Sequence, residues 1–300
     1  MSGEMSKAFR TGTLAIVGQP NVGKSTLLNR LIGQKISITS RKPQTTRHRI
    51  TGILTTPECQ YIFVDTPGFQ TKHPGALNRV MNRSVTQALS EVDITICVID
   101  AGRFGAADRA IIKLLPPDRP VLLAINKIDR LTDKSKLLPF IAQVAEVFPF
   151  AEIVPLSAAK GDGVDDLLKT AAKYLPEAPP FFEADEVTDR SERFLAAELL
   201  REKLFRNLGE ELPYGIAVEI ERFEQEGALR RIFAAIIVDK AAHKSIVIGR
   251  GGEKLKTMSS DARRDMEQLF GGPVYLETWV KVKSGWADDE RALKSLGYDQ

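Results

Sequence analysis

The chain contains the stretch Gly18-Gln19-Pro20-Asn21-Val22-Gly23-Lys24-Ser25, which is followed by Thr26. It fits the pattern G-x-x-x-x-G-K-[ST] and lies between an apolar run, residues 14–17, and an amphipathic segment, residues 24–32. The glycines allow main-chain amides to turn toward an anion, and the N-terminus of the helix adds a positive partial charge. We therefore predict that residues 18–26 bind a polyphosphate. The Lys24 ammonium would reach the β- and γ-phosphates, and the Ser25 hydroxyl would ligate Mg²⁺.

The rest of the first half alternates short apolar runs with amphipathic segments. Continuous apolar runs predict strands that are covered on both faces, and their alternation with helices predicts a doubly wound, mostly parallel α/β sheet. A weaker extended segment, Arg49–Leu54, could be an edge strand. The predicted strands are Leu14–Val17, Tyr61–Val64, Ile94–Ile99, Val121–Ile125 and Ile153–Leu156, and the predicted helices are Lys24–Ile32, Asn78–Leu89, Ala106–Leu115, Leu137–Val147 and Val164–Leu175.

Three prolines within Pro176–Pro180 cannot continue a helix, so we place a domain boundary there. Beyond it the order of elements changes to that of an α+β domain. Its predicted elements are a helix over Arg190–Leu208, strands over Ile216–Phe223 and Arg230–Val238, a helix over Glu253–Phe270 and a strand over Val274–Val282. We predict an N-terminal tail (1–10), a nucleotide-binding domain (11–178), a linker (179–189), a second domain (190–284) and a C-terminal tail (285–300).

The apolar run at Tyr61–Val64 ends in Asp65-Thr66-Pro67-Gly68. An aspartate at the C-terminal end of a strand near the phosphate loop can hold Mg²⁺ through water. Gly68 offers an unhindered main-chain N–H that could sense the γ-phosphate. Taken alone these four residues are typical of an ordinary turn, but after a phosphate loop the magnesium interpretation is favoured.

Two further polar segments follow strands. Asn126-Lys127-Ile128-Asp129 comes after Val121–Ile125. One carboxylate can accept both N1–H and the N2 amine of guanine, so Asp129 would select guanine over adenine. The Lys127 stem can cover the base, and Asn126 can tie this loop to the phosphate loop. The main-chain amides of Ser157-Ala158-Ala159-Lys160 could donate to guanine O6, although a plain polar loop explains that segment equally well.

The four elements in this order resemble the translation-factor-related class of P-loop GTPases, and Asn21, Thr45-Thr46 and Asp65–Gly68 resemble its bacterial ribosome-assembly members. The resemblance implies that a threonine between the first helix and the next strand closes over Mg²⁺ and the γ-phosphate. Thr45 and Thr46 both match, and Thr46 is favoured. Lys24, Thr46 and Gly68 are thus the candidate catalytic residues, and Ser25, Thr46 and Asp65 the candidate metal ligands. The alternative is a solvated loop flanked by Arg41, Lys42, Arg47 and Arg49, disordered until a nucleotide binds.

One position departs from the pattern of many GTPases, which place a water-orienting glutamine directly after Asp-x-x-Gly. Here that residue is Phe69, whose ring cannot polarise water, so we expect slow intrinsic hydrolysis. In related GTPases with asparagine at the Asn21 position, a potassium ion stabilises the transition state. Whether Asn21 has that role here or only shapes the loop stays open.

The second domain carries Gly249-Arg250-Gly251-Gly252, a G-x-x-G between a strand pair and an amphipathic helix. The segment resembles a K-homology domain of the bacterial topology, whose Gly-x-x-Gly loop clamps about four nucleotides of RNA. Residues 181–300 hold 19 basic and 23 acidic residues, yet residues 240–264 hold seven basic and two acidic residues. The predicted RNA-binding residues are Gly249, Arg250, Gly251, Gly252, Lys244, Lys254 and Lys256. The resemblance implies a short helix over Ala242–Ile248, whereas its β-branched residues favour a strand.

With the segment Trp279–Arg291 included, the whole chain is similar to one family of bacterial GTPases that have a C-terminal K-homology domain. The resemblance implies GTP or GDP with Mg²⁺ as ligands, binding to the 3′ end of small-subunit ribosomal RNA, and a role in small-subunit assembly. It also implies peripheral association with the membrane. We expect nucleotide-dependent movement of the switch segments to alter the RNA-binding domain, and we expect a monomer.

The composition is that of an ordinary globular protein, and the cysteine count indicates the cellular compartment. Hydrophobic residues make up 43% of the 300 residues and charged residues 27%, as in ordinary globular proteins. No apolar run reaches the ~18 residues of a membrane span, and no signal peptide is evident. Two cysteines, Cys59 and Cys97, make neither a disulfide framework nor a metal site, so we expect the reducing cytoplasm.

Two other classes of protein share part of this pattern. A P-loop kinase is disfavoured by the guanine-selecting Asn126–Asp129 segment and by the lack of an evident lid for an acceptor substrate. An RNA-binding module with a purely structural nucleotide site stays open because of Phe69.

Overall fold

The structure is a computed structural model that describes residues 8–40, 42, 44–69, 75–209 and 212–298. The chain divides into two compact units. The first comprises residues 1–34, 49–70 and 82–189, and the second comprises residues 35–48, 71–81 and 190–300. Arg41 and residues 1–7 of the predicted N-terminal tail lie outside the described residues. The domain boundaries derived from the sequence stay a prediction.

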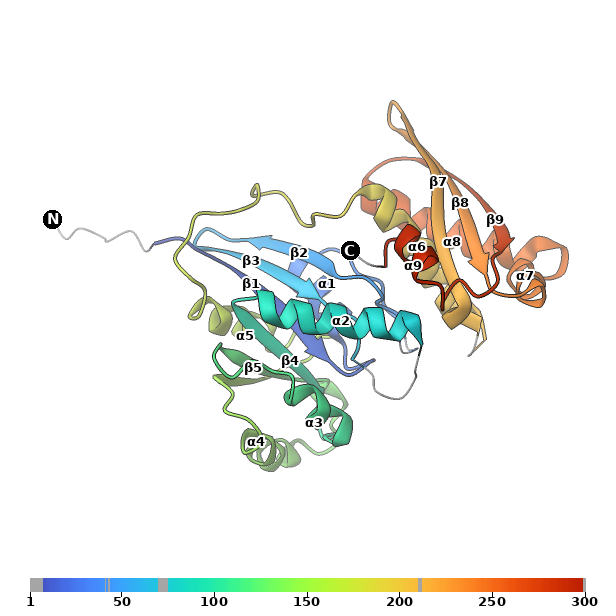
Figure 1. Ribbon diagram of the computed structural model, residues 1–300. Coiled ribbons are helices and arrows are strands. Elements are labelled where there is room, and N and C mark those ends of the chain that lie inside the picture. The colour runs from blue at the N-terminus through green and yellow to red at the C-terminus, as the bar shows by residue number, and fades with distance from the viewer. Residues whose placement is uncertain (1–7, 41, 43, 70–74, 210–211, 299–300) are drawn as a thin grey trace. The chain divides into compact units, whose positions relative to one another are not determined.

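The first unit is built on a six-stranded sheet with the order β2-β3-β1-β4-β5-β6 (Figure 1). Its strands are β1 (Arg10–Gly18), β2 (Ile50–Thr55), β3 (Cys59–Asp65), β4 (Ile94–Asp100), β5 (Val121–Asn126) and β6 (Glu152–Pro155). All neighbours are parallel except β2 and β3, which pair antiparallel. The predicted mostly parallel sheet is confirmed, and the weak segment near residue 50 is its edge strand.

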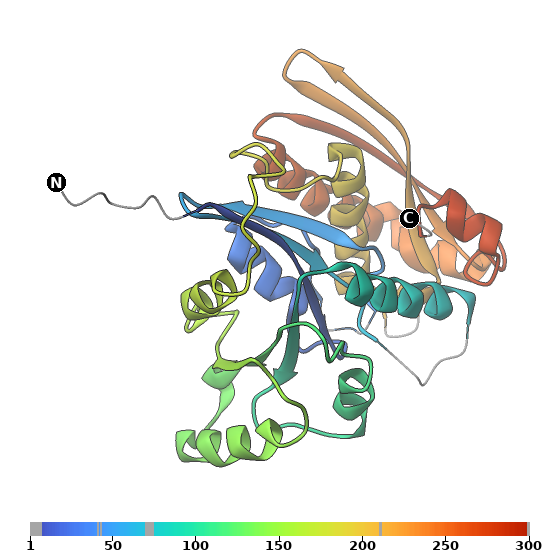
Figure 2. The ribbon, with the colours of Figure 1, turned by 60° about the vertical axis from the view of Figure 1, so that its left-hand side comes forward.

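Helices cover both faces of this sheet (Figures 1 and 2). The helices are α1 (Lys24–Ile32), α2 (Ala76–Glu91), α3 (Ala106–Ile112), α4 (Leu137–Ala145) and α5 (Val164–Ala172). Side chains of α2, α3 and α4 share one apolar core with β1, β3, β4 and β5, while α1 and α5 lie against each other. Cys59 and Cys97 are buried in this unit as free thiols, and burial raises the pKa of Cys97 to about 12.

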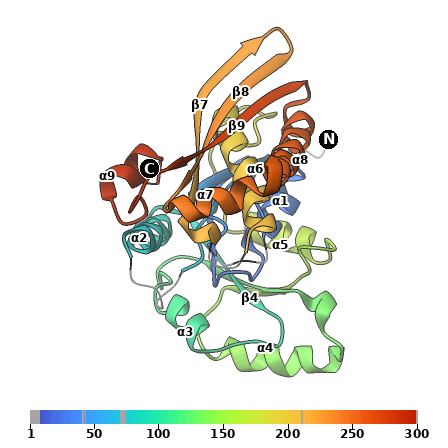
Figure 3. The same ribbon diagram turned by 90° about the vertical axis from the view of Figure 1, so that its right-hand side faces the viewer.

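The second unit has a three-stranded sheet, β7-β8-β9, in which β7 and β8 are antiparallel and β8 and β9 are parallel. Its strands are β7 (Ile216–Glu226), β8 (Leu229–Val238) and β9 (Val274–Val282). Helices α6 (Glu192–Asn207) and α8 (Glu253–Phe270) pack on each other and share an apolar core with the sheet (Figure 3). The predicted α+β architecture is confirmed.

The segment for which the resemblance and the residue types gave opposite expectations is a helix, α7 (Ala241–Ile248). The expectation from the resemblance was right and the one from β-branched residues was wrong. Helix propensities of valine and isoleucine fall only a few tenths of a kcal/mol below those of good helix formers, so packing of the buried Val247 outweighs them. A further helix, α9 (Glu290–Ser295), follows β9.

Candidate nucleotide and RNA sites

The backbone of the loop between β1 and α1 requires glycine at two positions. Gly18 and Gly23 have φ angles of +154° and +100°. A Cβ at Gly23 would lie 2.3 Å from the Asn126 side-chain nitrogen, and one at Gly18 would lie 2.4 Å from the Val98 carbonyl oxygen. The glycines of the pattern are therefore required by the close approach of β4 and β5.

The Lys24 ammonium is buried and donates to main-chain oxygens of its own loop. Its Nζ donates to the carbonyl oxygens of Gly18 (3.1 Å) and Gln19 (3.0 Å). Burial lowers the pKa of Lys24 to about 8, against the opposing effect of the Asp65 carboxylate. No acidic residue lies in the first turn of α1, and its N-cap Gly23 provides no side-chain cap. A buried cation beside uncapped helix amides fits a polyphosphate.

The proposed metal ligands of the first unit lie together. The Ser25 hydroxyl donates to Asp65 Oδ2 over 2.7 Å, and Asp65 is the last residue of β3. Thr66 holds this turn by donating to the Ile16 carbonyl oxygen (2.9 Å). A Cβ at Gly68 would lie 2.8 Å from the main-chain nitrogen of Pro20, so the Asp65–Gly68 turn rests directly on the phosphate loop. A hydroxyl next to a carboxylate is a donor set that suits Mg²⁺.

Thr45 and Thr46 belong to the second unit. Both are buried, as is the neighbouring Arg47. The Thr45 hydroxyl donates to the carbonyl oxygen of Lys42 over 2.7 Å. The alternative interpretation of these residues as a solvated loop is therefore wrong, because side chains of the second unit cover them.

The guanine-recognition segments are joined to the phosphate loop by one amide side chain. Asn126 Nδ2 donates to the carbonyl oxygen of Val22 (2.8 Å), and its Oδ1 accepts from the main-chain nitrogens of Lys127 (2.8 Å) and Ala158 (2.9 Å). Asp129 Oδ1 accepts from the Ser157 hydroxyl over 2.6 Å. Strand ends distant in sequence thus converge, as the carboxyl ends of parallel strands do.

Two residues of this region were missed by the sequence analysis. Lys127 Nζ donates to the Asn21 carbonyl oxygen (2.5 Å) and to Asp100 Oδ2 (2.9 Å), so Asp100 fixes the lysine stem. Its position as an acid at the C-terminal end of β4 was a signal that could have identified it. Arg30 donates to the carbonyl oxygens of Ala158 and Ala159, which are 3.2 and 2.7 Å away. No sequence pattern indicated that contact.

The Gly249–Gly252 loop joins α7 to α8. Gly249, Gly251 and Gly252 have φ angles of +75°, +59° and +81°. A Cβ at Gly251 or Gly252 would meet nothing within 4 Å, so this side of the loop is open. Arg250 is exposed, as are Lys244 and Lys256, while Lys254 is half-buried. Near the loop, Ile246 is 48% exposed, an apolar surface that the sequence analysis did not single out.

The comparisons with known proteins identify a GTPase domain and a KH domain in this chain. A family model described as "50S ribosome-binding GTPase" matches residues 13–127, and a KH-domain model matches residues 211–287. The chain is 60% identical over 294 residues to the GTPase Era of Nitrosomonas eutropha, covering 98% of this chain and 99% of the relative. It is 57% identical over 291 residues to the GTPase Era of Chromobacterium violaceum, covering 97% and 98%.

Two solved structures are similar to this one over nearly the whole chain. One is Era in complex with MgGDPNP and nucleotides 1506–1542 of 16S ribosomal RNA, and the other is an Aquifex aeolicus Era variant bound to GDP and AlF₄⁻. Each has a TM-score of 0.94 and 41% sequence identity, and the match covers 97% of this chain and 100% of the other.

Proposed function

Since the chain belongs to the Era family of GTPases, we propose that it binds the 3′ end of 16S ribosomal RNA and assists assembly of the small ribosomal subunit. The chain is a GTPase with a K-homology domain. The proposal for its RNA rests on the relative whose structure contains nucleotides 1506–1542 of that RNA. In this chain it is supported by the open side of the Gly249–Gly252 loop and the basic residues around it.

For GTP hydrolysis we propose that residues 18–26, 65–68, 126–129 and 157–159 bind the nucleotide. The observation that supports this proposal is that the Asn126 side chain connects the phosphate loop at Val22 to the base-binding loop at Ala158. The phosphates and the base of one molecule are thereby bound at a fixed spacing. Asp129 accepts from guanine, and Lys127 lies along the base with its ammonium fixed by Asp100.

Water attacks the γ-phosphate in line with the departing β–γ bridging oxygen, which leaves as part of GDP while the water proton passes to the phosphate product. Lys24 and the loop amides stabilise the charge that develops on the phosphoryl oxygens. Ser25, Asp65 and Thr46 are the residues that would hold Mg²⁺, which when bound would neutralise negative charge on the phosphates. Phe69 cannot orient the water, so the intrinsic rate is low.

Phosphate release from GTP, measured in potassium and then in sodium, tests this proposal. Release that is magnesium-dependent and faster in potassium supports an ion at Asn21, whereas equal rates in both salts assign Asn21 only to the loop shape. Absence of release in either salt would contradict the enzymatic proposal.

The RNA site is tested by Gly251→Asp, which places a carboxylate on the open side of the loop. We expect at least about a tenfold loss of affinity for an RNA of nucleotides 1506–1542, since one phosphate contact is replaced by repulsion. Gly227→Asp is a matched control, because Gly227 also has a positive φ (+62°) and a Cβ added there would meet nothing within 4 Å. Equal losses in the two variants would contradict the assignment.

We further propose a cytoplasmic monomer that associates peripherally with the membrane. The cytoplasmic location follows from a ribosomal partner. Among the described residues, no helix is both long and apolar enough to cross a membrane. Sedimentation of the protein with vesicles of anionic lipid, with and without GTP, tests the membrane association.

A further inference from the structure

The segment Lys35–His48 lies between α1 and β2 in the chain and carries the threonines proposed to close on Mg²⁺, yet it packs as part of the second unit. This segment packs against helix α6. One side of α6 is apolar and faces the sheet, with Ala196, Leu200 and Leu204 in the core of that unit. Its other side carries Glu198, Arg201 and Glu202, which are also buried. Charged groups are rarely buried without partners, so what satisfies them is informative.

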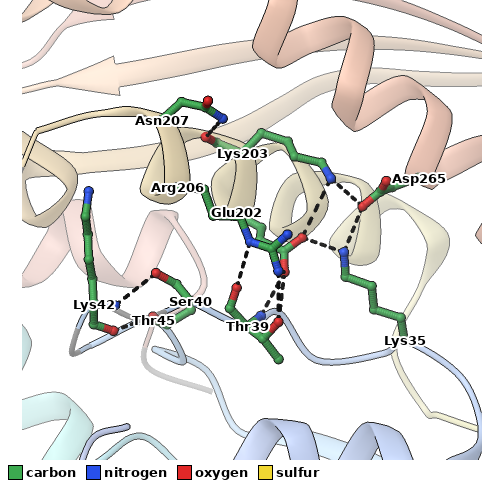
Figure 4. A network of polar contacts seen from close by, with 10 residues as sticks. All are labelled: Lys35, Thr39, Ser40, Lys42, Thr45, Glu202, Lys203, Arg206, Asn207 and Asp265. Carbon is green, nitrogen blue, oxygen red and sulfur yellow. Dashed lines mark hydrogen bonds and ion pairs between the residues drawn. The ribbon is translucent and has the colours of Figure 1, made fainter. Parts of the chain in front are cut away.

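Glu202 is satisfied by the segment itself (Figure 4). Its Oε2 accepts from the Lys35 ammonium over 2.5 Å. Its Oε1 accepts from the main-chain nitrogen of Thr39 (2.9 Å) and from Arg206 Nη2 (2.9 Å). Arg206 in turn donates to the carbonyl oxygen (3.1 Å) and hydroxyl (3.0 Å) of Thr39. One fully buried carboxylate therefore fixes both ends of residues 35–39.

The threonine end of the segment is held in the same way. Arg201 Nη2 donates to the carbonyl oxygen of Thr45 over 2.6 Å, while Glu198 orients Arg201 through two bonds of 2.7 and 2.6 Å. Arg47 donates to the carbonyl oxygens of Ile216, Pro213 and Tyr214, at 2.8, 3.0 and 3.1 Å. Thr45 and Thr46 are thus flanked on both sides by bonds to the second unit.

The same network reaches the helix that follows the Gly249–Gly252 loop (Figure 4). Asp265 of α8 accepts from Lys35 Nζ (2.7 Å) and from Lys203 Nζ (2.6 Å). The two ammonium groups lower the pKa of the Asp265 carboxyl despite partial burial, so the carboxylate stays charged. Lys35 therefore bridges α6 and α8, and α8 begins at Glu253, directly after the loop.

We propose that Glu202 and Arg201 are positioning residues that couple the GTPase site to the RNA site by holding residues 35–48 on α6. This inference rests on the proposed function. A threonine that ligates Mg²⁺ beside Ser25 and Asp65 must bring its neighbours with it, because the peptide chain is continuous. Closure on GTP then either breaks the bonds to Glu202 and Arg201 or moves α6 with the segment. In both cases the nucleotide and RNA affinities depend on each other.

The coupling is measured as the ratio of RNA affinities in the GDPNP and GDP states, with RNA of nucleotides 1506–1542 as the probe. In Glu202→Gln the shape is retained, but Arg206 loses its counter-charge and Lys35 keeps only that of Asp265. We expect this ratio to move toward 1 by about tenfold, because hydrogen bonds to a neutral amide are weaker than those to a carboxylate. We also expect the affinity for GDPNP relative to GDP to change by the same factor, because coupling is reciprocal.

Glu192→Gln is the matched control. Glu192 is in the first turn of α6 and forms two bonds, of 2.6 and 2.7 Å, with Arg230, away from residues 35–48. It is the same substitution in the same helix and should leave the affinity ratio unchanged. Lys35→Met, at a side chain that is 35% exposed, removes the other end of the same bond should Glu202→Gln fail to fold.

Two results would overturn the coupling: a wild-type protein that binds RNA with equal affinity in the two nucleotide states, or variants at Lys35 and Glu202 that retain the wild-type ratio. Non-additive effects in the Lys35→Met/Glu202→Gln double variant support it. Failure of the wild-type protein to bind guanine nucleotide or RNA at all would instead refute the proposed function, so the two failures are distinguishable.

Discussion

The phosphate loop and the buried face of α6 both enclose cations, but they satisfy them differently. Lys24 donates to two neutral carbonyl oxygens, and its pKa falls to about 8. Arg201 has the Glu198 carboxylate at hydrogen-bond distance; burial works against its charge, yet the carboxylate raises the pKa of Arg201. The phosphate loop therefore has a cation available for a ligand, whereas the cations on the buried face of α6 bind other segments of the same chain.

The largest expected effect is a loss of stability on changing the buried face of α6. Burial alone would raise the pKa of Glu198, but Arg201 outweighs it and lowers that pKa. Glu198→Gln leaves Arg201 without its counter-charge in a buried site, which costs about 3–5 kcal/mol of unfolding free energy. Urea unfolding followed by tryptophan fluorescence reports it selectively, because Trp279 and Trp286 both belong to the second unit.

Asp261→Asn is the control for that measurement. Asp261 pairs with Arg264 on the surface of α8 over 3.5 Å, and exposed pairs contribute less than about 1 kcal/mol. If both variants lost equal stability, the contrast between the two regions would fail.

The next effect concerns the phosphate loop. Lys24→Ala removes the cation that the loop keeps for phosphate, and we expect phosphate release to fall by about 100- to 1000-fold. The fold should remain, since the hydrogen bonds of the ammonium to Gly18 and Gln19 go to neutral oxygens and the nearby Asp65 carboxylate keeps its bond from the Ser25 hydroxyl. Lys169→Ala, at an exposed lysine of α5, should release phosphate at the wild-type rate. Wild-type activity in Lys24→Ala would remove the distinction between a ligand-binding and a structural cation.

Base selection is tested by Asp129→Asn. An amide can donate to the O2 of xanthine but cannot accept from both guanine donors, so preference should shift from GTP to xanthosine triphosphate by about 100-fold. Competition between the two nucleotides measures this shift. The Ser157 hydroxyl can donate to the new amide oxygen as it does to Asp129, so the loop should keep its shape. An unchanged preference for GTP would show that the base is read elsewhere.

The smallest effect is a pH dependence of the second unit. Burial lowers the pKa of His48 to about 4, although Glu198 opposes it, while Arg201 and Arg190 act in the same direction as burial. The unfolded chain therefore takes up this proton more readily, and stability is lost as pH falls from about 6.5 toward 4. At pH 5 the loss is about 2 kcal/mol.

His48→Phe isolates this contribution, because phenylalanine can stack on Tyr298 as His48 does, at 4.5 Å between ring centroids, but cannot titrate. The difference between the two proteins in urea unfolding free energy should grow between pH 6.5 and pH 5. A constant difference across this range would contradict the assignment to His48.

Sequence patterns predicted the first unit well because its function and its fold share the same residues. Periodicity located β1 to β6, and the glycines of residues 18–25 are both the turn and the phosphate contact. The antiparallel edge strand β2 was weaker in the sequence because its burial falls off toward Thr55. Asp100 and Arg30 could not be assigned from pattern alone, since their partners come from strands and loops that only the fold brings near.

The second unit was predicted in outline but not in its most informative part. Helical spacing predicted α6, yet nothing in the local sequence showed that Glu198, Arg201 and Glu202 would be buried by residues 35–48. Burial of charge depends on partners about 160 residues away in the chain, such as Thr39 for Glu202. Helix α9 is short and was not predicted, and it packs through Ala292 and Leu293 against Trp286.

The two buried thiols have a practical consequence. Cys59 and Cys97 are the only cysteines of the chain, both are buried, and the Cys97 thiol remains protonated at neutral pH. A thiol reagent should therefore label neither in the native protein. A single cysteine introduced at exposed Lys256 would be the one reactive site, ready for a fluorophore or a spin label without removing any native cysteine. The wild-type chain is already a clean background for spectroscopy of its own motions.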